Sequence, residues 1–326
     1  MNETSSKFVD KMAMERLLSE KLSQVSHSPV NSIFEQIDID IDSIDKYSLD
    51  ELTVNEYRAS QLNYFLLPSF SGTSHYPENN NVYLYHSPSE NPEGNILLLH
   101  GLYDDNLDNY NFLIKLLNEL KLNVYLMILP FHYDRKPEES SFGGEFFFSA
   151  DFYRSRFAFK QALYDIEVSL QFIKKHNALA TVLSGFSMGG CLVSRYYLLQ
   201  KPSVNVFLIN PVTNITTLPW DNPLMITIRR DIEDSGTDIN EYKAVFNELN
   251  VYENINKPFA ENAAMIYSIY DQIISEEKYQ RFIKKAGIKN VGRYQAGHLN
   301  ILRVPRLSRD IYDFYNSQVK GGVCYE

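Results

Sequence analysis

Short apolar runs alternate with longer amphipathic stretches along most of this chain. Residues 96–99 and 124–129 are continuously apolar, which is typical of strands buried on both faces of a parallel sheet. Further runs rich in β-branched and aromatic residues predict strands at 62–67, 82–86, 181–183, 204–209, 263–270 and 291–295. Helical spacing of apolar residues predicts helices at 108–120, 152–176, 191–200, 275–286 and around Ile311. Strands that alternate with helices predict an α/β fold with a mostly parallel central sheet and helices on both faces.

Two segments depart from this alternation. In the N-terminal part, helical spacing at 7–24 predicts an amphipathic helix that packs on its own domain. Residues 37–42 alternate strictly between Ile and Asp, which predicts an edge strand with one acidic face. Residues 210–258 are polar, contain several prolines and carry short helical stretches, so we predict an inserted helical cap. These boundaries divide the chain into an N-terminal extension (1–60), a core (61–209 and 259–316), the cap (210–258) and a tail (317–326).

The first candidate for chemistry is the sequence Gly185-Phe186-Ser187-Met188-Gly189, which stands between a predicted strand and a predicted helix. Strand, G-x-S-x-G and helix in this order form the pattern of a nucleophile elbow. Such a turn holds its serine in a strained conformation above the sheet, at a helix N-terminus whose partial positive charge favours a developing anion. An ordinary Gly/Ser-rich loop is the alternative interpretation of the motif alone.

Two further candidates follow the last two predicted strands. Asp271 comes directly after 263–270, and His298 comes shortly after 291–295. Open α/β sheets place their sites at the carboxyl ends of parallel strands. His298 would take the proton of Ser187 and return it to the leaving group, while Asp271 would hold the imidazole tautomer and stabilise the imidazolium. A helix N-cap is the alternative role for Asp271, although Ser275 is better placed for that role.

The tetrahedral anion formed on a serine needs backbone N–H donors. We expect one donor to be the N–H of Met188, the residue after Ser187. The other is expected to be the N–H of Leu102, in the loop after His100, where Gly101 lets the chain bend close to the site. We expect His100 to brace this loop rather than to act in catalysis.

Other polar and aromatic residues near these loops are interpreted as structural. Asp104 and Asp105 are expected to cap the helix that begins near residue 108, with attraction of a cationic substrate group as the alternative. His132 and Arg135 are expected to tie down the irregular segment that contains them, and contact with substrate is the alternative. The aromatic residues at 142–148 are expected to pack in the core or against the cap, or else to form an apolar pocket wall.

Four motifs in one chain order together resemble the α/β-hydrolase superfamily over roughly residues 80–316: Leu97-Leu98-Leu99-His100-Gly101, Gly185-Phe186-Ser187-Met188-Gly189-Gly190, Tyr270-Asp271 and Gly297-His298. The resemblance implies a mostly parallel sheet of eight strands, a cap between strands six and seven, and hydrolysis through an acyl-enzyme. The serine at the elbow argues against epoxide hydrolases and dehalogenases, which use an aspartate.

Composition and charge narrow the classes of function. The net charge of −10 and the lack of a long basic patch disfavour nucleic acid as a partner. The apolar runs are too short to span a bilayer, and the first 24 residues lack the apolar stretch of a signal peptide, so we expect no membrane span and a cytoplasmic location. Cys191 and Cys324 have no metal-ligand spacing, and the repeat at 37–42 lacks the Gly and closing Glu of a Ca²⁺ loop. We therefore expect no metal and no organic cofactor.

The sequence thus predicts a serine hydrolase that cleaves a carboxylic ester through an acyl-enzyme on Ser187, with a thioester or an amide as alternative substrates. Its partner would be a small-molecule acyl substrate. An acyltransferase with the same three residues is the nearest rival, because an acceptor other than water can resolve the same acyl-enzyme. A non-catalytic binding protein on the same fold is the rival from a different class.

Overall fold

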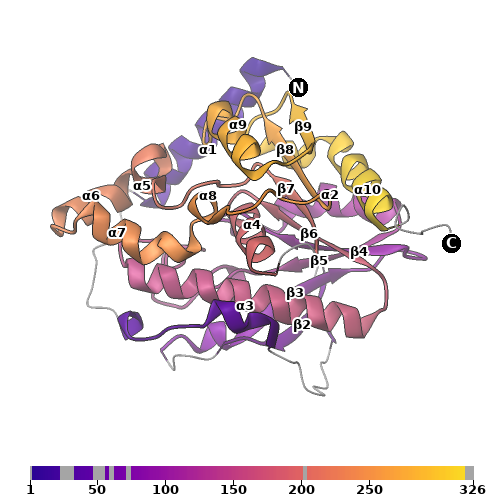
Figure 1. The fold of residues 1–326 in the computed structure, drawn as a ribbon, viewed down its shortest axis with the longest axis horizontal. Helices are drawn as coiled ribbons and strands as arrows, with labels where there is room; N and C mark the ends of the chain where they lie inside the picture. Colours follow the sequence, from indigo (N-terminus) through magenta and orange to yellow (C-terminus); the bar gives the residue numbers. More distant parts are fainter. Residues whose placement is uncertain are drawn as a thin grey trace.

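One central sheet organises the computed structural model (Figure 1), which describes residues 2–22, 33–46, 56–58, 62–70, 75–200 and 204–319. Its nine strands follow across the sheet in the order β1 (Glu56–Arg58), β2 (Asn63–Pro68), β3 (Asn81–Ser87), β5 (Leu122–Met127), β4 (Gly94–Leu99), β6 (Thr181–Phe186), β7 (Asn205–Ile209), β8 (Ala263–Ser268) and β9 (Asn290–Tyr294). The pairs from β1 to β5 are antiparallel, and all pairs from β5 onward are parallel. The expected mostly parallel sheet is confirmed, and the three-residue β1 adds a strand at its antiparallel edge.

Helices lie on both faces of the sheet, as Figure 1 shows. Among the described residues the α-helices are α1 (Glu3–Glu20), α2 (Asp108–Glu119), α3 (Phe152–His176), α4 (Met188–Gln200), α5 (Leu218–Asp221), α6 (Ile226–Asp234), α7 (Ile239–Phe246), α8 (Val251–Asn254), α9 (Glu276–Ala286) and α10 (Pro305–Val319). The predicted helices at 108–120, 152–176, 191–200, 275–286 and around Ile311 are confirmed as α2, α3, α4, α9 and α10.

The continuous apolar sequence of β4 follows from its position between two cores. Leu97 and Leu99 face the core that contains α3 and α4, whereas Ile96 and Leu98 face the core that contains α2 and α10. All four side chains are fully buried. A strand covered on both faces has no solvent side, so it does not alternate between apolar and polar residues.

The register of the strands brings several loops to one edge of the sheet. Leu99 at the end of β4 pairs with Gly185 near the end of β6, and Ser268 at the end of β8 pairs with Tyr294 at the end of β9. Because these strands are parallel, the loops that follow all four of them leave at the same edge. This is where open α/β sheets place their ligand sites.

The N-terminal helix packs on its own domain, as predicted, but the predicted amphipathic pattern is wrong, because the apolar Phe8 and Met12 are exposed. Helix α1 begins at Glu3, after Asn2, whose side chain accepts a 2.8 Å hydrogen bond from the N–H of Ser5. Its Ser6 and Asp10 are fully buried, and Asp10 contacts the loops that follow β8 and β9. Figure 1 shows this indigo helix at the same end of the molecule as α9 and β9.

The edge strand predicted at 37–42 is wrong. The chain there runs into a 3₁₀-helix, η3 (Ile41–Lys46), and Ile39, Ile41 and Ile44 are buried. The carboxylate of Asp40 accepts bonds from the N–H of Asp42 at 3.1 Å and the hydroxyl of Ser43 at 2.6 Å. Such local bonds from an Asp side chain offer the backbone an alternative to pairing in a sheet.

Between β7 and β8 the chain forms the short helices α5 to α8. Leu218 of α5, and Leu224 and Met225 between α5 and α6, are buried in the core that also contains α3 and α4. Figure 1 shows α5, α6 and α7 grouped at one end of the molecule. The segment has the position and helical content predicted for the cap, and its boundaries at 210 and 258 stay a prediction.

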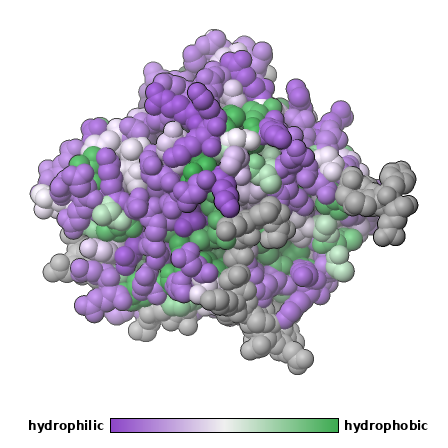
Figure 2. All heavy atoms as spheres, in the orientation of Figure 1, coloured by the Kyte–Doolittle hydropathy of each residue, from purple (hydrophilic) through white to green (hydrophobic). Residues whose placement is uncertain are grey.

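The outer surface is mainly polar on the face drawn in Figure 2, where hydrophilic residues cover most of the area and hydrophobic ones show between them. In the described parts of the chain, no helix is both long and apolar enough to cross a membrane. Cys324 and most of the predicted tail lie outside the described residues.

Candidate active site

Ser187 stands at a strained turn between β6 and α4. Its φ of +54° lies in the left-handed region, which non-glycine residues rarely adopt and which clusters at functional sites. The turn is fixed from both sides, since the Ser187 N–H donates to the Ile209 carbonyl at 2.9 Å and the Ser187 carbonyl accepts from the N–H of Val212 at 3.0 Å. The predicted elbow geometry is present.

The glycines on either side of Ser187 allow strand and helix to approach each other closely. A Cβ at Gly185 would lie 2.4 Å from the carbonyl carbon of Gly189, and a Cβ at Gly189 would lie 2.6 Å from the carbonyl oxygens of Leu99 and His100. These neighbours are backbone atoms, which cannot move aside as a flexible side chain can. The motif therefore needs glycine at both positions for steric reasons.

We expect Gly185→Ala to lower the free energy of unfolding by about 3 kcal/mol and to reduce any activity at Ser187, because overpacking shifts the backbone of the turn. Gly236→Ala is a matched control, since Gly236 has a φ of +73° but a Cβ added there would meet nothing within 4 Å. The control should lose only about 1 kcal/mol, which is the cost of a Cβ in the left-handed region. Equal losses for the two variants in urea unfolding would contradict the steric argument.

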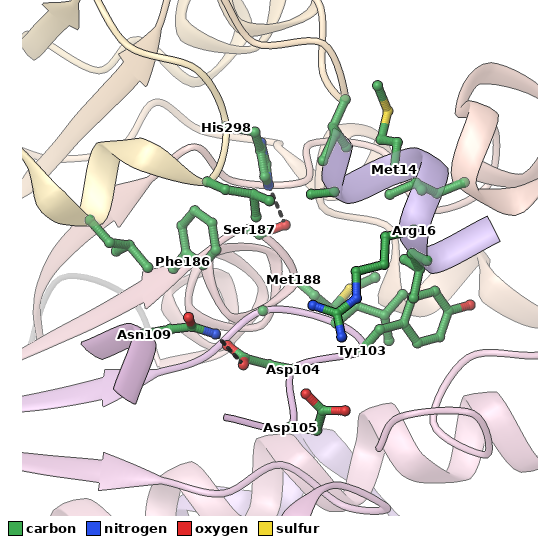
Figure 3. Close-up of a pocket in the computed structure, with 18 of the residues that line it drawn as sticks. Met14, Arg16, Tyr103, Asp104, Asp105, Asn109, Phe186, Ser187, Met188 and His298 are labelled. Carbon is green, nitrogen blue, oxygen red and sulfur yellow. Dashed lines mark hydrogen bonds between the residues drawn. The ribbon is translucent and has the colours of Figure 1, made fainter. Parts of the chain in front are cut away.

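The structure brings the three predicted residues into one hydrogen-bonded chain. His298 Nε2 lies 2.9 Å from Ser187 Oγ, and His298 Nδ1 lies 2.7 Å from Asp271 Oδ2. Because an ionised carboxylate only accepts hydrogen bonds, Nδ1 carries the proton and Nε2 is free to accept from the Ser187 hydroxyl. Figure 3 shows the imidazole directed at the serine oxygen.

Asp271 is held by three groups besides His298. Its Oδ1 accepts from the N–H groups of Ile273 at 2.7 Å and Ile274 at 2.8 Å, and its Oδ2 accepts from the Tyr279 hydroxyl at 2.7 Å. Ser275 occupies the N-cap position of α9, but its side chain makes no capping hydrogen bond, contrary to expectation. Oδ1 of Asp271 thus stabilises the turn that leads into α9, whereas Oδ2 accepts the hydrogen bond from the imidazole.

The environment of His298 favours its charged form. Burial by itself lowers the pKa of this imidazole, but the charge and hydrogen bond of Asp271, aided by the charge of Asp10, raise the pKa above its ordinary value. The side chains of His298 and Asp271 are only 2% and 0% exposed, so little water screens the pair. The imidazole is therefore a stronger base than an ordinary histidine side chain.

The loop after β4 lies against the elbow. The N–H of Gly189 donates to the His100 carbonyl at 3.1 Å, and both Leu102 and Met188 line the cavity at Ser187. His100 Nδ1–H donates to the Gly101 carbonyl at 2.8 Å, while Nε2 accepts from the N–H of Leu129 at 3.1 Å. Burial lowers the pKa of His100, so it stays neutral and braces the loop, as predicted.

The capping role expected for Asp104 is wrong. Its Oδ2 accepts from the Tyr110 hydroxyl at 2.6 Å, and that hydroxyl accepts from the N–H of Gly101 at 3.2 Å. Asn106 instead accepts the N–H of Asp108 at 2.9 Å at the start of α2. Asp105 forms an ion pair with Lys21, which follows α1. Both carboxylates therefore stabilise the loop after β4 without capping, Asp104 through side chains in the first turn of α2 and Asp105 through Lys21.

His132 and Arg135 are structural, as predicted. His132 Nδ1–H donates to the Pro130 carbonyl at 2.9 Å, and burial holds the pKa of this imidazole well below its ordinary value. Arg135 is fully buried and pairs with the buried Asp165 at 2.7 Å. The neighbouring aromatic segment packs in the core, where the ring centroid of Phe147 lies 4.9 Å from that of Phe159.

A cavity of about 610 Å³ opens at Ser187 and His298. Many of its walls are apolar, and they come from distant parts of the chain: α1 (Met14, Leu17), the segment between β7 and β8 (Val212, Leu218, Leu224, Met225), and Ile273. Asp104 of the loop after β4 and Asn109 of α2 are among the polar residues that line another side. Figure 3 shows Met14 and Arg16 of α1 on one side of Ser187, and Phe186 and Asn109 on the other.

The sequence analysis did not identify the residues that support Ser187, His298 and Asp271 or the loops around them. Tyr279, Tyr110 and Asp10 each bond a site residue or its loop, yet none carries a motif. Tyr279 lies on the helix after Asp271 and one could look for it there, but nothing near Asp10 signals its contact with a loop 288 positions away.

Among the described residues, no group of three or more His, Cys, Asp or Glu is arranged to hold a metal ion.

No model of a known protein family and no curated protein matches this sequence. Solved structures are nevertheless similar. An acetyl xylan esterase from Paenibacillus sp. R4 covers 91% of this chain and 98% of its own, with a TM-score of 0.62 and 12% identity. Est1E from Butyrivibrio proteoclasticus, with ferulic acid bound, covers 74% of this chain and 96% of its own, with a TM-score of 0.54 and 14% identity.

An acylaminoacyl peptidase from Pyrococcus horikoshii covers 85% of this chain but only 44% of its own, with a TM-score of 0.56 and 13% identity. This chain thus corresponds to less than half of that peptidase. At such low identity, the likeness to all three proteins shows a shared fold and leaves the chemistry to be argued from the site itself.

Proposed function

We propose that this chain, which has the α/β-hydrolase fold, is a serine hydrolase that cleaves a carboxylic ester. The observation that carries the proposal is the chain of hydrogen bonds from Ser187 through His298 to Asp271, in a buried site that opens into a cavity. Esterases among the structures of similar fold are consistent with this reaction.

In the proposed reaction, Ser187 Oγ attacks the carbonyl carbon of the ester as His298 Nε2 accepts the hydroxyl proton. The imidazolium then donates that proton to the departing alcohol, which leaves an acyl group on Ser187. Water, deprotonated by the same nitrogen, attacks the acyl carbon; the imidazolium then returns the proton to Ser187 Oγ as the bond between that oxygen and the acyl carbon breaks, and the acid is released. Asp271 holds the imidazole orientation and stabilises its positive charge through both steps.

The amide N–H groups of Leu102 and Met188 are the proposed donors to the tetrahedral oxyanion. Met188 begins α4, so its N–H belongs to a helix terminus that favours negative charge. The contact between Gly189 and His100 keeps the two loops together, which supports a shared site for one oxygen. Preorganised backbone donors of this kind stabilise the charge that develops in the transition state without reorganising.

The apolar walls of the cavity support an acyl group of moderate size as the substrate moiety. Met14, Leu218, Leu224 and Met225 present hydrocarbon and thioether surface to the space beside Ser187. A small number of polar groups on the opposite side can orient the alcohol. We expect chromogenic esters of different chain lengths to reveal this preference as a change in kcat/KM.

The activity should fall on the acid side with an apparent pKa above about 6.5, because His298 must be neutral to accept the serine proton and its pKa is raised. Above this pKa the imidazole is neutral and the rate reaches a plateau; below it the imidazolium cannot act as a base. The measurement is kcat/KM against pH at constant ionic strength. A midpoint below about pH 6 would contradict the environment described for His298.

Labelling with a fluorophosphonate tests the proposal directly, since this reagent phosphonylates an activated serine. Wild-type protein should carry the adduct on the peptide that contains Ser187, and Ser187→Ala should not react. Ser194→Ala is the matched control, because the Ser194 hydroxyl is buried in α4 and bonds the Gly190 carbonyl at 2.8 Å. Folded wild type that stays unlabelled and hydrolyses no ester would reject the enzyme in favour of a binding protein. Product analysis with added alcohols would identify an acyltransferase.

A further inference from the structure

The carboxylate of Asp10 bridges the two loops that carry His298 and Asp271. Its Oδ2 accepts from the N–H of His298 at 2.6 Å and from the N–H of Gln272 at 3.3 Å, and its Oδ1 accepts from the N–H of Leu299 at 3.1 Å. Asp10 is fully buried. A single side chain of α1 thus holds the backbone of one residue of the proposed triad and of the neighbour of another.

Close packing fixes this arrangement further. A Cβ at Gly297 would lie 2.7 Å from Asp10 Oδ2 and 2.8 Å from the Ser6 carbonyl oxygen, so the loop after β9 touches α1 directly. One turn before Asp10, the Ser6 hydroxyl accepts from Asn300 Nδ2 at 3.2 Å. Helix α1 is therefore seated on the loop at both ends of the sequence Gly297-His298-Leu299-Asn300.

A buried carboxylate is costly unless its charge is satisfied, which makes its position informative. Three N–H donors favour the ionised form of Asp10, although burial raises its pKa above the ordinary value. The charged and titratable groups that face it are His298, Asp271 and, through Asp271, the Tyr279 hydroxyl. Negative charge at Asp10 adds to that of Asp271 in stabilising the His298 imidazolium.

The same helix forms one wall of the cavity. Val9, Ala13, Met14 and Leu17 of this helix line the cavity at Ser187, and Figure 3 shows Met14 on the wall across from Phe186. A helix that only stabilised the fold could pack anywhere on the core. This helix instead lies on the loops of the site, and its only fully buried carboxylate in the described residues points at them.

We propose that Asp10 is a positioning residue for the reaction, which holds the His298 and Asp271 loops in register and makes α1 part of the active centre. It touches neither substrate nor the reacting atoms and acts through the backbone of His298, Leu299 and Gln272 and through its charge. This inference rests on the proposed serine hydrolase function.

The test is Asp10→Asn, measured by ester hydrolysis over pH. An amide has one acceptor oxygen, so at least one of the N–H groups at His298, Gln272 or Leu299 loses its partner. We expect kcat to fall by roughly 10- to 100-fold with KM within about threefold, as small misplacements of catalytic groups cost about that much. The acid limb of kcat/KM should move to lower pH by on the order of 0.5 unit, less than the shift a direct ionic partner produces, because the imidazolium loses a stabilising charge.

Two controls separate charge and position from folding. Glu15→Gln removes one negative charge from an exposed site on α1 and should leave kcat and the acid limb unchanged. Ser6→Ala removes an uncharged contact between α1 and the same loop, so its acid limb should stay at the wild-type pH whatever the change in rate. A lower rate for Asp10→Asn with an unmoved acid limb would reduce Asp10 to a structural residue and overturn the proposal.

The failure of this inference differs from the failure of the proposed function. If wild type is labelled at Ser187 and hydrolyses esters while Asp10→Asn keeps the wild-type kcat and acid limb, the inference is wrong and the function stands. If wild type neither reacts nor hydrolyses, the function itself is wrong. Should Asp10→Asn not fold, Gly297→Ala takes its place, since the added methyl displaces the carboxylate and should move kcat and the acid limb in the same directions.

Discussion

Ser187→Ala and His298→Ala are each expected to lower kcat for ester hydrolysis by roughly 10⁴- to 10⁶-fold, and the double variant by no more than either alone. The reason is that the hydroxyl and the imidazole act as a unit across their 2.9 Å contact. Without the base the serine is a weak nucleophile, and without the serine the base has no proton to accept. KM should change little, because the apolar walls that bind the acyl group are untouched.

Asp271→Asn extends the same experiment and should lower kcat by about 10⁴-fold. The N–H groups of Ile273 and Ile274 would keep the amide oxygen at the position of Oδ1, so the N–H₂ would face His298 Nδ1 and disturb the imidazole tautomer. Single-turnover and steady-state rates on a chromogenic ester give the values, with circular dichroism to establish folding. Losses that multiply in the double variant of Ser187 and His298 would show that the two groups act independently and would contradict the proposed mechanism.

Arg135→Met is expected to lower the free energy of unfolding by about 3–5 kcal/mol, the usual cost of removing one partner of a buried ion pair. Arg135 and Asp165 lie 2.7 Å apart, and both side chains are 0% exposed. The guanidinium also donates to the carbonyls of Ile128 at 2.9 Å and Asn79 at 3.2 Å. The variant leaves a carboxylate buried without its counter-charge and removes one donor from each of these carbonyls.

The loss should be partly restored in the double variant Arg135→Met/Asp165→Leu, because two apolar side chains leave no uncompensated charge. Arg281→Met is the matched control: Arg281 pairs with Glu277 on the exposed face of α9, and its removal should cost less than about 0.5 kcal/mol. Urea unfolding curves provide all four free energies. A double variant that is no more stable than Arg135→Met would contradict the assignment of the loss to the buried charge.

The fold could be predicted from the sequence wherever burial alone decides the pattern. Strands β4 and β5 are covered on both faces, so their apolar runs have no other stable location. The alternation at 37–42 led to a wrong prediction of an edge strand, because periodicity indicates which side chains are buried and not how the backbone pairs. Local bonds from Asp40 decided the structure there, and such bonds leave no mark on the hydrophobic pattern.

Some residues of the proposed site could likewise be predicted from the sequence, and others could not. Ser187, Asp271 and His298 could be placed because each follows a strand end, and parallel strands bring their ends together. Tyr110 could not, since the bonds of its hydroxyl to Gly101 and Asp104 in the loop after β4 depend on how α2 packs. Asp10 is the extreme case, because the helix that carries it has an ordinary sequence and its partners are three backbone N–H groups, which every residue except proline offers.

The bridge between Asp10 and His298 also sets an order of events during synthesis. The two residues are 288 positions apart, so α1 emerges from the ribosome long before the loop on which it is seated. At translation rates of about 5–20 residues per second, roughly 15–60 s pass between them. During this interval the carboxylate of Asp10 lacks its N–H partners at His298 and Leu299, and once Ser187 has been made the nascent chain carries an elbow serine without its base. Chain synthesis itself thereby delays the reactive state until the loop that carries His298 has been made.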